Sequence, residues 1–163
     1  MGQIKKSLMK IPVKKRKLNK KPPISRIVVD GSNVARAGLK DGQGSAEQLI
    51  IVYNSLKKDY GFDGIVILIG AGLRHHTPDF EKLKQYIDND VVREAPAGTS
   101  DDFYIIQFAL DNDMLILTND MYRDFKEKHL ELKGQIDMRR VTFMINPDGS
   151  LSLGEFPNYK KEE

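Results

Sequence analysis

Five short apolar runs, separated by longer amphipathic segments, constrain the fold of this chain more than any other feature. They are rich in Val and Ile, and they occupy positions 27–29, 65–69, 91–92, 114–117 and 141–145. Successive positions in each run are apolar, which is typical of parallel strands that are covered by helices on both faces. The runs therefore predict the strands of one central sheet.

The segments between the runs carry helix signals. Apolar residues recur with helical spacing at positions 46, 49, 50, 53 and 56, and Thr-Pro-Asp at 77–79 is typical of a helix start. A third helix is expected from Ser100 or Asp101 to about Asn112, and a fourth after Asn119. Strands and helices thus alternate, which predicts an α/β fold: a three-layer α/β/α sandwich around a mostly parallel sheet. Pro-Asp-Gly at 147–149 predicts a C-terminal hairpin that continues into 150–153.

Charge divides the chain into an arm and a body. The chain has 163 residues with 26 Lys and Arg and 23 Asp and Glu, yet the segment 1–21 holds nine of the basic residues and no acid. The body is therefore acidic overall. Pro22 and Pro23 resist helix formation and separate the two parts. We expect a disordered basic arm over 1–23, one domain over 24–157 and a short tail over 158–163.

Several classes of protein are excluded by composition. The chain has no cysteine, which removes disulfide scaffolds, thiolate zinc sites and thiol nucleophiles. No apolar run approaches the roughly 18 to 20 residues of a membrane span. The apolar stretch at 8–13 is short and contains Lys10 and Pro12, unlike a signal peptide. A cytoplasmic protein without a membrane partner is expected.

Carboxylates from three segments fall where predicted strands end. Asp30 follows the first run, Asp101 and Asp102 open the third helix, and Asp120 follows the fourth run, with Asp124 four residues later. In open α/β sheets, ligands bind beyond the carboxyl ends of the strands. We therefore expect these five side chains to meet at one edge of the sheet, with the last two on one helix face.

Each of these acids has an ordinary structural explanation, as a turn residue, a helix cap or a first-turn acid. Capping does not offset their mutual repulsion, which is about 4 kcal/mol for two charges 4 Å apart at an effective dielectric of 20. A divalent cation would offset it, and an all-oxygen site suits Mg²⁺ or Mn²⁺ rather than zinc. Asp30 would be the central ligand, and Asn33 would offer an amide to a phosphate or a water.

Such an ion can orient a water, lower the pKa of that water and neutralise charge on phosphorus during an in-line displacement. A receiver-type phosphoacceptor site also uses paired acids at strand ends. That chemistry needs two adjacent acids after the first strand and a lysine after the last, and neither is present.

Three motifs resemble those of the PIN-like ribonucleases of the NYN group, most closely the Regnase-like, or Zc3h12a-like, branch. They are IVVDGSNVA at 27–35, SDDF at 100–103 and TNDMYRD at 118–124, and their order matches the family over about residues 25–157. The resemblance implies a PIN-like fold and a Mg²⁺-dependent endoribonuclease that acts on single-stranded or loop RNA.

The resemblance also assigns roles to individual side chains. It implies an acidic, metal-binding centre of Asp30, Asp101, Asp102 and Asp120. Asp124 and Asn33 match the outer catalytic positions. Many relatives hold RNA with a Cys3His zinc finger, for which this chain has no cysteine. The segment before Ser100 is also more compact than in some relatives.

Basic and polar residues are expected to bring RNA phosphates to this acidic centre. The candidates in the arm and near the motifs are Lys14, Lys15, Arg16, Lys17, Ser32, Arg36, Lys40, Arg74, His75, His76 and Arg123. The arm also fits a solubilising or ribosome-binding tail, and Arg123 also fits an ion pair within the acids. His75 and His76 could act as general acids, but the simpler interpretation is that they are solvent-exposed loop residues. Tyr122 fits either a base-stacking residue or a core residue.

The function that these features predict is metal-dependent hydrolysis of phosphodiester bonds in RNA. One rival is a non-catalytic RNA- or ribosome-binding module on the same scaffold, and another is a toxin-like nuclease held by a partner protein. Homodimerisation is plausible for this architecture, although no apolar surface stripe in the sequence argues for it.

Overall fold

The computed structural model of the protein describes residues 24–157. The expected basic arm, with Lys14, Lys15, Arg16 and Lys17, and the expected tail lie outside the described residues. The division into arm, domain and tail stays a prediction.

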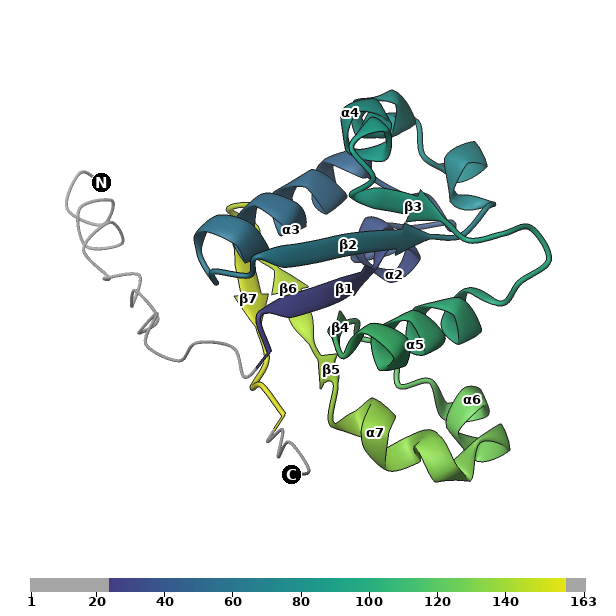
Figure 1. Ribbon diagram of the computed structural model, residues 1–163. Coiled ribbons are helices and arrows are strands. Elements are labelled where there is room, and N and C mark those ends of the chain that lie inside the picture. Colours follow the sequence, from purple (N-terminus) through teal and green to yellow (C-terminus); the bar gives the residue numbers. More distant parts are fainter. Residues whose placement is uncertain (1–23, 158–163) are drawn as a thin grey trace.

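A five-stranded parallel sheet forms the centre of the described part of the chain, in the strand order β3-β2-β1-β4-β5 (Figure 1). Its strands are β1 (Arg26–Asp30), β2 (Gly64–Ile69), β3 (Val92–Glu94), β4 (Leu115–Leu117) and β5 (Arg140–Val141). In the central strand, Val28 pairs with Val66 of β2 and Ile116 of β4. The apolar centre of β1 is fully buried, as expected of a strand covered on both faces.

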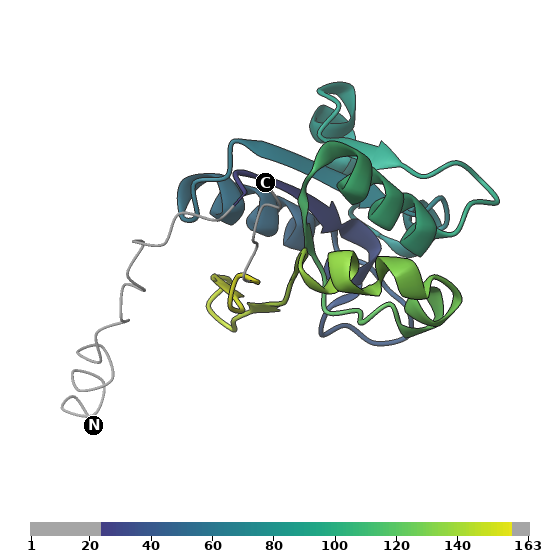
Figure 2. The same ribbon diagram turned by 60° about the horizontal axis from the view of Figure 1, so that its bottom comes forward.

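Helices cover both faces of the sheet, which confirms the predicted α/β fold. They are α2 (Gly31–Arg36), α3 (Ala46–Lys58), η1 (Leu73–His76), η2 (Phe80–Leu83), α4 (Lys84–Asp88), α5 (Asp101–Asn112), α6 (Arg123–Lys128), η3 (Leu130–Leu132) and α7 (Lys133–Asp137). Figures 1 and 2 show α3 on one side of the sheet and α5 on the other. Because side chains alternate along a strand, Ile27 and Val29 join the core beneath α3, whereas Val28 joins the core beneath α5.

The last predicted strand, 141–145, is divided in the structure. β5 pairs in parallel with β4, whereas β6 (Phe143–Ile145) pairs antiparallel with β7 (Leu151–Leu153) in a separate two-stranded sheet. The side chain of Asn119 replaces a neighbouring strand at the division: its Nδ2 donates to the Phe143 carbonyl (3.0 Å) and its Oδ1 accepts from the Phe143 amide (2.9 Å). The predicted C-terminal hairpin is confirmed.

The helices near the site differ from the prediction in two ways. The first difference is α2, which begins directly after β1 and was not predicted. This tight connection requires Gly31, because a Cβ there would lie 2.6 Å from the Leu68 carbonyl oxygen of β2. The predicted helix after Asn119 begins only at Arg123, because Tyr122 adopts a left-handed conformation (φ 50°). Asp120 therefore lies before the helix, and its expected helix face shared with Asp124 is wrong.

The Thr-Pro-Asp sequence at 77–79 has a different use from the predicted one. The predicted helix is present as the 3-10 turn η2, which leads directly into α4, but no side chain caps either element. The carboxylate of Asp79 instead accepts hydrogen bonds from the Ala46 and Glu47 amides, at 2.8 and 3.1 Å, at the start of α3. Partial burial raises the pKa of Asp79, but these amides outweigh it and hold the pKa below its usual value.

None of the helices over 24–157 combines the length and the apolar character needed to cross a membrane.

Candidate functional site

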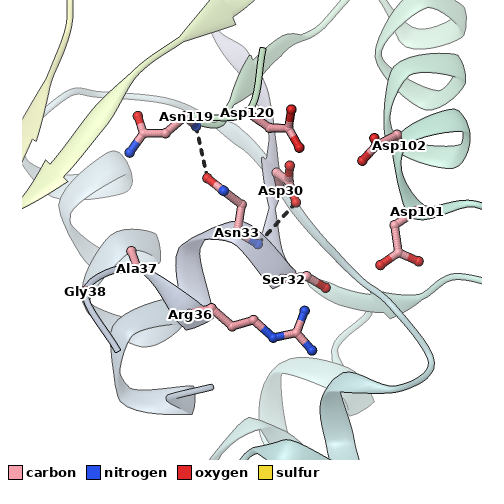
Figure 3. A pocket seen from close by; sticks show the side chains of 10 residues that line it. All are labelled: Asp30, Ser32, Asn33, Arg36, Ala37, Gly38, Asp101, Asp102, Asn119 and Asp120. Atoms are coloured by element: carbon pink, nitrogen blue, oxygen red, sulfur yellow. Dashed lines mark hydrogen bonds between the residues drawn. The ribbon is translucent and has the colours of Figure 1, made fainter. Parts of the chain in front are cut away.

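The carboxyl ends of β1 and β4 and the start of α5 enclose a cavity of about 410 Å³ (Figure 3). β1 and β4 are parallel neighbours, so the residues that follow them emerge side by side. The lining combines four carboxylates with polar and basic side chains: Asp30, Ser32, Asn33, Arg36, Ala37, Gly38, Asp101, Asp102, Asn119 and Asp120.

Asp30, at the end of β1, is the most buried of these acids, with 4% of its surface exposed. Its Oδ2 accepts hydrogen bonds from the hydroxyls of Thr118 and Tyr122, both at 2.8 Å. Its Oδ1 accepts only the longer 3.3 Å bond from the Asn33 amide. Burial raises the pKa of Asp30, the three hydrogen bonds oppose this, and the charge of Asp120 adds to the rise. Oδ1 is consequently the oxygen with more remaining capacity for a ligand.

Tyr122 connects two of the acids. Its side chain is 1% exposed, its hydroxyl contacts Asp30, and its backbone amide donates to Asp120 Oδ1 at 2.7 Å. Burial raises the pKa of Tyr122, as does the nearby negative charge of Asp30, so the phenol stays a proton donor. Of the two interpretations open from the sequence, the core residue is correct, and the buried hydroxyl gives it a positioning role that sequence reasoning missed.

Asn33 ties α2 to the loop after β4. Its Oδ1 accepts from the Asn119 amide at 2.9 Å (Figure 3). The same oxygen lies 3.5 Å from the Thr118 hydroxyl. The side-chain oxygen is thus used inside the protein, which leaves the NH₂ group for a phosphate or a water. Thr118 was not predicted as a site residue, although a polar residue at the end of an otherwise apolar buried strand was a signal for it.

Asp102 experiences the whole cluster of acids. It is partly buried and lines both the first cavity and a second, adjoining one of about 390 Å³. Burial raises the pKa of Asp102 to about 6, and the charges of Asp120, Asp30, Asp101 and Asp124 contribute in that order. The second cavity is lined by Asp102, Asn119, Asp120, Met121, Tyr122, Arg123 and Asp124. The five predicted acids therefore lie around two adjoining cavities.

Asp101 is oriented differently from the other acids. Figure 3 shows the carboxylates of Asp30, Asp102 and Asp120 turned toward one another, while that of Asp101 points away from them. The Asp101 carboxylate packs against Gly70, where it occupies the space of a side chain. Within residues 24–157, no three Asp, Glu, His or Cys side chains are close enough together to hold a metal ion. The oxygen donors suit Mg²⁺ or Mn²⁺ chemically, but they would have to move closer to share one ion.

Only some of the predicted RNA-binding residues reach the cavities. Arg36 and Ser32 line the first cavity and Arg123 lines the second. The Arg36 Nε donates to the Gly42 carbonyl at 3.1 Å, and the Ser32 hydroxyl accepts from the Gly70 amide at 3.1 Å. Among the described ion pairs none involves Arg123, whose guanidinium instead contacts the Met121 sulfur at 3.7 Å.

The other predicted basic residues line neither cavity. Lys40 is exposed, and His75 and His76 are exposed within η1. Arg74 pairs with Glu94 at 3.3 Å, and its guanidinium lies 4.9 Å from the centre of the Phe80 ring. Arg74 thus has a carboxylate and a ring as partners within the protein, and its contact with RNA stays a prediction.

Comparison with known proteins gives a family and a structural neighbour. The family model described as the Zc3h12a-like ribonuclease NYN domain matches residues 23–163. No curated protein sequence matches significantly. Two solved structures of Arabidopsis thaliana nuclear protein-only RNase P 2 are similar, with a TM-score of 0.67 in both cases and sequence identities of 27% and 26%. Each match covers 81% of this chain but only 30% of the solved one, so this chain spans less than a third of its length.

Proposed function

Because the chain belongs to the Zc3h12a-like ribonuclease NYN family, we propose that it is a Mg²⁺- or Mn²⁺-dependent endoribonuclease that hydrolyses single-stranded or loop RNA. The observation that carries this proposal is the set of carboxylates turned toward one another at the ends of β1 and β4 and the start of α5. Burial, and then repulsion by the neighbouring carboxylates, raise the pKa of Asp102 to about 6. A bound divalent cation would relieve this repulsion.

Asp30, Asp102 and Asp120 would hold the ion, and Asp101 would join them if its side chain rotates away from Gly70. When bound, the ion would lower the pKa of a water and neutralise charge on the phosphorus. Thr118 and Tyr122 fix Asp30 through its Oδ2, which directs Oδ1 to the ligand. Asp124, in the adjoining cavity, would contribute a negative charge at the outer edge.

The remaining polar groups would position the RNA. The NH₂ group of Asn33 and the hydroxyl of Ser32 can donate to phosphate oxygens from one wall of the first cavity. Arg36 and Arg123 stand in different cavities on either side of the acids and can each neutralise a backbone phosphate. These contacts would offset the repulsion between an acidic site and a polyanion.

The test is cleavage of an unstructured, end-labelled RNA in Mg²⁺ or Mn²⁺, with EDTA as the metal-free control. Asp30→Asn and Asp102→Asn should abolish cleavage, because each removes a ligand charge, whereas Asp63→Asn, an exposed acid before β2, should leave it unchanged. Strong cleavage by repurified Asp30→Asn protein would refute the proposal. RNA binding without any cleavage by the wild-type protein would instead fit the non-catalytic RNA- or ribosome-binding module.

A further inference from the structure

We propose that the exposed ring of Phe103, which lies beside the ring of Phe125, is a stacking surface for one unpaired RNA base next to the acidic cluster. This inference rests on the proposed function and deepens it, because it assigns the residue that holds the nucleotide flanking the cleaved bond. Neither ring lines the cavities themselves.

The rings stand beside the acids because of their places in the chain. Phe103 directly follows Asp102 in α5, and Phe125 directly follows Asp124 in α6, while both acids line the second cavity. The two ring centres are 6.3 Å apart, and α5 and α6 are neighbours in Figure 1. Phe103 and Asp102 are successive helix residues whose side chains point in different directions, so a base on Phe103 would belong to a neighbouring nucleotide rather than to the one at the acids.

The aromatic surface continues away from the cavity. The Phe125 ring centre lies 4.5 Å from that of His129, and the two ring planes are inclined by 30°. Phe103 therefore lies beside a second ring, which itself lies beside a third. These contacts leave much of Phe103 accessible, since 45% of the residue is exposed.

Single exposed apolar residues are common and need no function. Phe103 differs because it directly follows Asp102, which lines both cavities, and because a second exposed apolar residue, Met121, lines the second cavity together with Asp102. Arg123 lies in the same cavity, and it is free of ion pairs within the described residues. The Phe103 ring can stack on a base, and the Arg123 guanidinium, whose described partner is only the Met121 sulfur, can pair with a phosphate.

An unpaired base is the occupant that fits this chemistry. Every base has a π-face that stacks on an aromatic side chain, and the loss of one such contact lowers affinity by about 5- to 150-fold. Bases inside a duplex are already stacked on both sides, so only a single-stranded or looped-out nucleotide can reach the ring. Arg123 would take the phosphate of the same nucleotide.

The first experiment measures stacking without cleavage. The chain contains no tryptophan, so Phe103→Trp introduces a single tryptophan, whose emission can be excited selectively over that of the tyrosines. A matched control is Met144→Trp on β6, where 61% of the residue is exposed and no cavity of the site is lined. In EDTA, a short oligouridylate should quench the emission of Phe103→Trp in a saturable manner and leave that of Met144→Trp unchanged. Equal quenching of both proteins, or of neither, overturns the stacking surface.

The second experiment measures the effect on turnover. Phe103→Leu keeps apolar volume but removes the ring, so KM for single-stranded RNA should rise about tenfold with little change in kcat. Phe103→Tyr should restore the wild-type KM. The proposal is overturned if the Leu and Tyr variants both have the KM of the wild type. It is also overturned if Phe103→Leu lowers kcat alone, because Phe103 would then serve the packing of α5.

Failure of this inference is distinguishable from failure of the proposed function. If the wild-type protein cleaves RNA while Phe103→Leu has an unchanged KM, the surface is wrong and the ribonuclease stands. If the wild-type protein does not cleave, the ribonuclease is wrong, and the fluorescence experiment still decides whether a base meets Phe103. Sedimentation of wild-type and Phe103→Leu proteins tests self-association: a wild-type dimer that the substitution dissociates overturns the RNA assignment.

Discussion

Replacing Asp102 by asparagine should make the metal-free protein more stable at neutral and alkaline pH, although it should abolish cleavage. Burial and four neighbouring carboxylates raise the pKa of Asp102 from 3.8 to about 6. Between about pH 4 and pH 6 the folded protein therefore binds more protons at this site than the unfolded chain does, so its stability falls as the pH rises. Above this window the ionised Asp102 destabilises the fold by a constant amount, whereas an uncharged asparagine side chain at the same position would not.

The size of the effect follows from the pKa. A difference of roughly two pH units corresponds to about 3 kcal/mol at about 1.36 kcal/mol per unit. Because Asp102 is only partly buried, solvent screening reduces this to about 1 to 1.5 kcal/mol. For a domain of this size, we expect the Asp102→Asn protein to melt about 3 to 5 °C higher than the wild type at pH 8.

Thermal melts followed by circular dichroism in EDTA, from pH 4 to pH 8, measure this difference. The gain should be smallest at pH 4, where the folded carboxyl is protonated and the unfolded one is only partly ionised, and should reach its maximum above pH 7. Asp63→Asn controls for the general removal of one negative charge. Added Mg²⁺ should stabilise the wild type at pH 8 and reduce its deficit relative to the variant. The reasoning is refuted if Asp102→Asn is no more stable than the wild type at pH 8, or if its gain is the same at both ends of the range.

Three further perturbations test other parts of the site. Tyr122→Phe removes a buried hydrogen bond to Asp30, so it should lower the free energy of unfolding, measured by urea titration, by about 1 to 3 kcal/mol and should also lower kcat. A fully active and fully stable variant would contradict the positioning role. Gly70→Ala should push the Asp101 carboxylate away from residue 70 and lower the Mg²⁺ concentration needed for half-maximal cleavage, whereas Gly134→Ala, with open space at its Cβ position, should leave that concentration unchanged. Deletion of residues 1–21 should weaken RNA binding and flatten its dependence on salt concentration while turnover remains, and complete loss of turnover would contradict an accessory arm.

Hydrophobic patterning was sufficient to predict the sheet, because buried parallel strands need apolar residues on both faces. It was insufficient at 141–145, where one apolar run serves two sheets. The chain changes sheets there because Asn119, more than twenty residues earlier, pairs with the backbone of Phe143. A contact of that range has no signature in local periodicity.

The convergence of the acids was likewise predictable from the rule that strand ends meet at one edge. Their individual orientations were not. Asp101 and Asp102 are adjacent in sequence, yet only Asp102 faces Asp30, because successive side chains on a helix point in different directions. The role of Tyr122 depends on a left-handed backbone conformation that a non-glycine residue adopts rarely. Homodimerisation and cytoplasmic location stay predictions.

The pairing of Asn119 with Phe143 bears on when the site forms during synthesis. A ribosome releases the chain from its N-terminus, so all five acids are made before Phe143 and before the β7 strand that pairs with β6. Until then, Asn119 has no backbone partner at Phe143 to fix the loop between β4 and α6. A nascent chain stalled before residue 143 should therefore hold the complete set of acids in an incompletely fixed loop, and it should gain full activity only as the hairpin emerges.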